Sequence, residues 1–102
     1  MNIPEKIRVL YRTYQISEVD NLHDGGDDLY GQVQYLEERI LLNSAASDET
    51  KKAALIHEVV HTIDDLFGIG LEEKQVEQLG VGIYNLIRDN PEMFISERRP
   101  NE

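Results

Sequence analysis

The chain changes its hydrophobic period near residue 46. Before that point, apolar and polar residues alternate over 7–16, a segment rich in β-branched and aromatic side chains, which predicts a strand with one buried face. A second alternating segment, 30–35, and an apolar segment, 39–43, flank two adjacent glutamates that predict a turn. These two segments are typical of a β-hairpin.

Apolar residues then recur at helical spacing over 48–67, and Ser47 or Asp48 is suited to cap the N-terminus of this helix. The apolar positions cover most of the circumference, so we expect the helix to be central and buried. Gly68 supplies the left-handed conformation that commonly ends a helix.

A second helix is predicted over 71–89. It ends before Pro91, because proline disfavours the α conformation in the residue that precedes it. The expected core stripe of this helix consists of Val76, Leu79, Ile83 and Leu86.

The 102 residues suffice for one domain with a modest core. We therefore expect a single α+β domain, in which a small antiparallel sheet of about three strands is followed by two packed helices. Residues 1–46 form its β-rich part, 47–90 its two-helix unit and 91–102 a tail.

The charge balance narrows the range of partners. With 20 acidic and 10 basic residues the formal net charge is −10, which repels phosphate backbones. We expect no direct nucleic-acid binding and favour a basic protein partner.

No apolar run is long enough for a membrane span, and residues 1–10 lack the pattern of a secretory signal, so we expect a cytoplasmic protein. The chain contains no cysteine, so any transition metal must bind through histidine and carboxylate.

The run His57-Glu58-Val59-Val60-His61 falls in the first predicted helix. Histidines four residues apart lie on one face of a helix, where their imidazoles can converge on one metal ion. Glu58 points about 100° around the helix from His57, which places its carboxylate beside the ion rather than on it. There it can take a proton from the attacking water. The pattern predicts a catalytic zinc site.

A third ligand must come from elsewhere, because no histidine follows His61. Carboxylates on the second helix are the natural source, and Glu73 and Glu77 share one face with Gly80. We favour Glu77 because it lies deeper in the helix, whereas Glu73 belongs to the first turn, where a solvated carboxylate favourable to the helix dipole is an alternative explanation. Gly80 indicates that the two helices approach closely beside the metal.

The segment 47–94 resembles the gluzincin metallopeptidases, in which HExxH on one helix is joined by a glutamate from the next helix. It is most similar to the small ImmA/IrrE-type and phage-encoded members. The resemblance is carried by residues 54–61, 76–80 and 86–91. It covers about half of the chain directly.

The resemblance implies a minimal zincin-like domain that binds one Zn²⁺. His57, His61 and Glu77 would be the ligands and Glu58 the general base. The large C-terminal domain that supplies an oxyanion-stabilising histidine and a substrate pocket in bigger relatives is missing from this sequence.

Two supporting roles have several candidates. Large gluzincins often carry an aspartate four residues after the ligand glutamate to orient a ligand histidine; Val81 stands there in this chain, and Asp64 or Asp65 could serve instead. By helical phase, Tyr84 is the best-placed group to stabilise an oxyanion. The alternatives, which depend on how the loop and hairpin fold, are His23, Tyr30 and Tyr35.

The sequence thus predicts a zinc-dependent hydrolase, an endopeptidase that acts on an extended peptide or protein segment. Residues 40–43 are expected to offer an exposed sheet edge to which the substrate adds as a strand. The alternative is a non-catalytic, metal-stabilised protein-interaction module from a phage or mobile element. A third interpretation, an interaction domain without metal, requires Glu77 to lie far from both histidines. The oligomeric state is left open.

Overall fold

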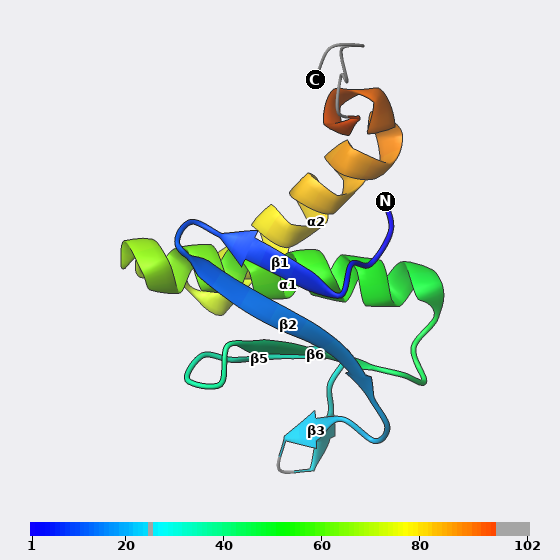
Figure 1. Ribbon diagram of the computed structural model, residues 1–102, viewed down its shortest axis with the longest axis vertical. Coiled ribbons are helices and arrows are strands. Elements are labelled where there is room, and N and C mark those ends of the chain that lie inside the picture. Colours follow the sequence, from blue (N-terminus) through cyan, green and yellow to red (C-terminus); the bar gives the residue numbers. More distant parts are fainter. Residues whose placement is uncertain (25, 96–102) are drawn as a thin grey trace.

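The computed structural model describes residues 1–24 and 26–95 and has an α+β fold (Figure 1). The N-terminal alternating segment forms two strands rather than one. β1 (Lys6–Val9) and β2 (Arg12–Val19) pair antiparallel around a turn in which Leu10 has a φ of 55°. The turn shifts the phase of the alternation, so Tyr14 of β2 is buried, whereas Tyr11 is 74% exposed.

The predicted β-hairpin is confirmed. β5 (Gly31–Gln34) and β6 (Arg39–Asn43) pair antiparallel, and β6 also pairs with β2 in parallel. The sheet therefore has four strands in the mixed order β1-β2-β6-β5, instead of about three antiparallel strands. Because β6 lies inside this sheet, the prediction that 40–43 forms an exposed edge is wrong, and the edge on that side is β5.

A separate small hairpin, β3 (His23–Asp24) and β4 (Asp27–Asp28), stands in the segment that composition marks as a loop. It projects from the end of β2 (Figure 1).

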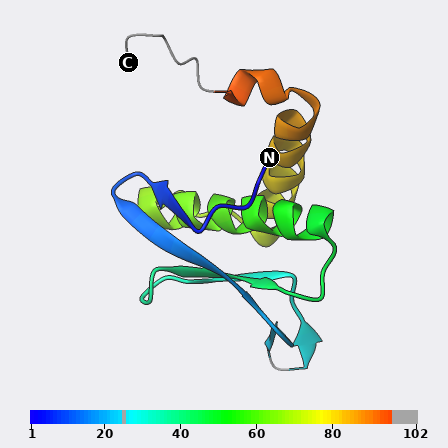
Figure 2. The same ribbon diagram turned by 45° about the vertical axis from the view of Figure 1, so that its right-hand side comes forward.

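The first predicted helix is confirmed as α1 (Asp48–Phe67). The Ser47 side chain accepts a hydrogen bond from the Thr50 N–H at the N-terminus, and Gly68 has a φ of 63° at the C-terminus. One side of α1 packs against β1, β5 and β6, and α2 packs on another side (Figures 1 and 2). The main core lies between α1 and the sheet and comprises Val9, Tyr14, Ile40, Leu42, Ala54 and Leu55.

The second helix, α2 (Glu73–Asp89), begins two residues later than predicted and leads into the short η1 (Pro91–Phe94). Within the described residues it lies against α1 and η1 and not against the sheet, and it extends away from the body (Figure 2). Its buried residues are Val76, Gly80 and Tyr84.

The predicted core stripe of α2 is therefore wrong except at Val76. Leu79, Ile83 and Leu86 are 45%, 37% and 46% exposed. The reason is that α2 has a single neighbour along most of its length, so only a narrow stripe of it can be covered. Neither helix of the described chain is apolar over enough length to cross a bilayer. Part of the predicted tail, 96–102, lies outside the described residues.

Candidate metal centre

The two histidines of the HExxH run lie one turn apart on α1, as predicted. The centroids of the His57 and His61 rings are 5.0 Å apart, and the ring planes meet at 65°. Both side chains are about one-quarter exposed. Burial of Leu55, Ile56 and Val60 on other sides of α1 fixes the rotation of the helix and so aims both imidazoles at α2.

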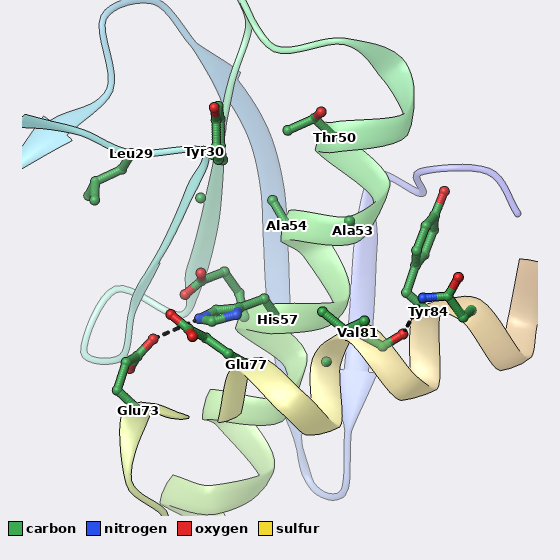
Figure 3. Close-up of a pocket in the computed structure, with 14 residues that line it drawn as sticks. Leu29, Tyr30, Thr50, Ala53, Ala54, His57, Glu73, Glu77, Val81 and Tyr84 are labelled. Carbon is green, nitrogen blue, oxygen red and sulfur yellow. Dashed lines mark hydrogen bonds and ion pairs between the residues drawn. The ribbon is translucent and has the colours of Figure 1, made fainter. Parts of the chain in front are cut away.

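Glu73, the first residue of α2, completes the cluster. Figure 3 shows its carboxylate beside His57. The distance from His57 Nε2 to Glu73 Oε1 is 3.1 Å, and that from His61 Nε2 to Glu73 Oε2 is 3.3 Å. One ligand atom from each of the three residues lies within 4.8 Å of the others. In a tetrahedral zinc site with bonds of about 2.1 Å, ligand atoms are separated by about 3.4 Å. Two imidazoles and a carboxylate at these separations are a donor set that fits Zn²⁺.

Glu77 does not belong to this cluster, although the sequence favoured it over Glu73 as the third ligand. It lies one turn further along α2, where its side chain lines an adjacent cavity (Figure 3). The depth of a residue within its helix did not predict which glutamate lies near the histidines. α2 approaches the histidines at its N-terminus, so a first-turn carboxylate that is 61% exposed reaches them.

The connection between the helices places Glu73. Asp64 Oδ1 accepts hydrogen bonds from the backbone N–H groups of Gly70, at 2.8 Å, and Leu71, at 3.0 Å. Gly70 has a φ of 83°, a left-handed conformation that suits glycine. Asp64 therefore holds the loop that leads into α2. The described hydrogen bonds do not support the prediction that Asp64 or Asp65 orients a ligand histidine.

The close approach of the helices that Gly80 indicated is confirmed. A Cβ atom added at Gly80 would lie 3.3 Å from His57 Cα and 3.7 Å from its Cβ. Such a contact is tighter than van der Waals packing allows without a shift of one helix. Gly80 thus lets the backbone of α2 lie directly against the first histidine.

Glu58 lies beside the cluster without belonging to it, and it is only 7% exposed. Burial raises the pKa of its carboxyl above the ordinary value, and the neighbouring His57 and His61 oppose that rise. Gly31 of β5 covers this carboxylate closely: an added Cβ would lie 3.2 Å from Glu58 Cγ. Sequence reasoning missed Gly31, although a glycine within a strand is a known sign of close approach.

Tyr84, the predicted oxyanion stabiliser, serves a different purpose in the structure. Its hydroxyl donates a hydrogen bond of 2.8 Å to Glu49 Oε1 in the first turn of α1. Glu49 precedes His57 by eight residues, which corresponds to about 12 Å along the helix axis. The structure does not bring the Tyr84 hydroxyl to the cluster, and this hydrogen bond ties α2 to α1 instead.

The other candidates for the oxyanion stabiliser lie in different parts of the fold. His23 is exposed on the β3–β4 hairpin, and Tyr30, which is 65% exposed, stands at the rim of the cavity beside the cluster. Tyr35 follows β5; burial, with a smaller contribution from Asp65, raises its pKa to about 12.

A cavity of about 640 Å³ adjoins the cluster, and we call it the trough. Thr50, Ala53 and Ala54 of α1 continue its floor away from His57 (Figure 3). α2 lines one side with Val81 and Tyr84, and residues 29–31 line the other. Its volume is within the range of about 300–1,000 Å³ typical of ligand sites. The sequence did not reveal the trough, because its hollow results from small residues that elements distant in the chain bring together.

Comparisons with protein-family models, with curated proteins and with solved structures found no match to this chain.

Proposed function

We propose that the chain is a zinc-dependent endopeptidase that acts on an extended segment of a peptide or protein. The observation that carries the proposal is the convergence of His57 Nε2 and His61 Nε2 on the two oxygens of Glu73, with the buried Glu58 beside them. The resemblance to small gluzincins, with Glu73 in place of Glu77 as the ligand glutamate, supports the same conclusion.

His57, His61 and Glu73 would hold one Zn²⁺, which polarises a scissile carbonyl and acidifies water when bound. Glu58 takes the proton from the attacking water and later transfers it to the leaving amine. Its burial favours this role because it raises the affinity of the carboxylate for a proton. β5 is the edge strand beside Glu58, and an extended substrate would pair with its backbone next to Gly31.

The test combines metal analysis with a Glu58→Gln substitution. Protein purified without chelator or affinity tag should contain about one zinc per chain by elemental analysis. Glu58→Gln removes the proton acceptor but no ligand, so zinc content should stay unchanged while cleavage of an unstructured protein such as casein falls by at least about 100-fold. Equal cleavage by the two proteins would contradict the proposed mechanism.

The second candidate is a metal-stabilised protein-interaction module without catalysis. The exposure of Leu79, Ile83 and Leu86 on α2 favours it, because such a stripe suits contact with another protein. This function requires zinc at the same site but no cleavage by the wild-type protein. The same two measurements therefore distinguish the candidates.

A further inference from the structure

The trough has a polar end and an apolar end. Its three carboxylates, Glu58, Glu73 and Glu77, all lie at or beside the histidine cluster. Away from His57, the floor consists of Thr50, Ala53 and Ala54, and the Thr50 hydroxyl is hydrogen-bonded to Ser47. No lysine or arginine is found among the described residues that line the cavity.

The apolar end is hollow because the floor positions carry methyl groups. Ala53 and Ala54 follow one another on α1, about one turn before His57, and the flanking side chains of Thr50 and His57 are larger (Figure 3). Val81, the Tyr84 ring and Asn85 form the wall on α2, and Leu29 stands opposite them; the Asn85 amide donates a hydrogen bond to the Val81 carbonyl. The Tyr84 hydroxyl is occupied by Glu49, so the tyrosine presents its ring to the trough without an unpaired polar group.

The position of this hollow relates it to the chemistry. His57 lines the trough directly, so a carbonyl held at the cluster would place the neighbouring side chain of the same molecule above Ala53 and Ala54. A large apolar side chain there would be removed from water. A carboxylate side chain would instead lose its hydration on entering the apolar hollow, and Glu58 and Glu77 close by would repel it. Both effects weaken its binding.

We propose that the trough between Ala53, Val81 and Tyr84 is a subsite for a large apolar side chain next to the bond that is cleaved. This inference rests on the proposed metal site and names the class of substrate that the site selects. The chain then cleaves beside residues such as leucine or methionine and discriminates against aspartate and glutamate at that position.

The test uses three hydroxamates, which chelate divalent metals, on the zinc-loaded full chain by isothermal titration calorimetry. Acetohydroxamate reports the metal alone, 4-methylpentanohydroxamate adds a branched apolar chain, and the monohydroxamate of succinic acid adds a carboxylate of similar reach. We expect the apolar compound to bind about 10- to 100-fold tighter than acetohydroxamate, because the hollow removes its alkyl carbons from water. The succinate compound should bind no tighter than acetohydroxamate.

Ala53→Phe fills the hollow and should abolish the preference for the apolar compound while leaving acetohydroxamate affinity within about threefold of wild type. Retained acetohydroxamate binding shows that this variant is still folded around the cluster. Ala45→Phe, which adds the same ring at an exposed position before α1, is the matched control and should keep the preference.

The outcomes separate the two proposals. Failure of zinc-loaded wild-type protein to bind acetohydroxamate would overturn the metal site itself. Equal affinity for acetohydroxamate and the apolar compound, or an unchanged preference in Ala53→Phe, would overturn the subsite and leave the metal site standing.

Discussion

The two helices that form the candidate site have similar lengths and very different surroundings. α1 spans 20 residues, contacts both the sheet and α2, and buries six of its side chains. α2 spans 17 residues, contacts α1, and buries three residues spaced four apart, one of which is Gly80. The paired histidines therefore stand on the best-supported element of the fold, whereas Glu73 stands on an element attached along a narrow stripe.

Glu73, the third member of the cluster, is therefore positioned locally rather than by the core. Glu73 is exposed, but the loop before it is tied to α1 through Asp64. The backbone contact at Gly80 then sets the separation of the helices beside His57. The geometry of the cluster should respond to substitutions at these few points and tolerate changes along the outer face of α2.

The largest expected difference is in folding stability. Leu55 of α1 is 1% exposed, so Leu55→Ala should lower the free energy of unfolding by about 2–5 kcal/mol through lost burial and a cavity. Leu86→Ala makes the same change on α2 at a residue that is 46% exposed, and it should cost less than about 0.5 kcal/mol. Urea unfolding measures both values. Similar losses of unfolding free energy in the two variants would show that a partner, such as a second copy, covers α2 in solution.

The next contrast is between the two glutamates of α2. Glu73→Ala removes a proposed ligand and should weaken zinc affinity by at least about 100-fold, beyond the 10- to 100-fold typical of residues that only contact a ligand. Glu77→Ala should change it by less than about threefold, because Glu77 lies outside the cluster. Competition with a chromophoric chelator measures the affinities. If Glu77→Ala proved the more damaging substitution, the original sequence-based choice of ligand would be right.

These glutamates also mark where sequence reasoning stopped. HExxH fixes its own geometry, because residues four apart on one helix must lie on one face, so the sequence predicted the proximity of His57 and His61. The choice between Glu73 and Glu77 depended on where α2 crosses α1. Helical phase puts both residues on the same face and carries no information about that crossing.

The fold, too, could be predicted from the sequence only where local signals determine it. Local signals found α1, with its cap at Ser47 and its end at Gly68, and the β5–β6 hairpin. The sequence missed the parallel pairing of β2 with β6 because it joins residues about 24 positions apart with no local pattern to mark it. The hydrophobic period of α2 predicted a helix correctly but could not reveal that its neighbour covers only part of the apolar face.

A smaller effect should follow at the loop between the helices. Asp64→Ala deprives the Gly70 and Leu71 N–H groups of their acceptor, and we expect a loss of about 1–2 kcal/mol in stability and up to about tenfold in zinc affinity. Asp64→Asn keeps an oxygen acceptor and should recover most of both. Asp65→Ala removes the adjacent, exposed carboxylate and serves as the control.

The role of Asp64 can be isolated with a double-mutant cycle. If Asp64 acts on the metal through Glu73, then Asp64→Ala should cause no further loss of zinc affinity in a Glu73→Ala background. A full, additive loss in that background would mean that Asp64 influences the histidines by another route. The free energies of unfolding of the same four proteins distinguish a general loss of stability from a loss of ligand placement.

The smallest contrast compares one hydroxyl at the helix interface with one in the core. Tyr84→Phe removes the hydrogen bond to Glu49 that links α2 to the first turn of α1, and it should cost about 0.5–1.5 kcal/mol. Tyr14 is fully buried, and its hydroxyl has no hydrogen-bond partner in the part of the chain that the structure describes. Removing an unsatisfied buried hydroxyl relieves a desolvation cost, so Tyr14→Phe should be neutral or stabilising. Because both substitutions delete the same atom, their difference in urea unfolding isolates what the Tyr84–Glu49 contact contributes to holding α2. A loss in Tyr14→Phe as large as that in Tyr84→Phe would show that a buried water satisfies the core hydroxyl.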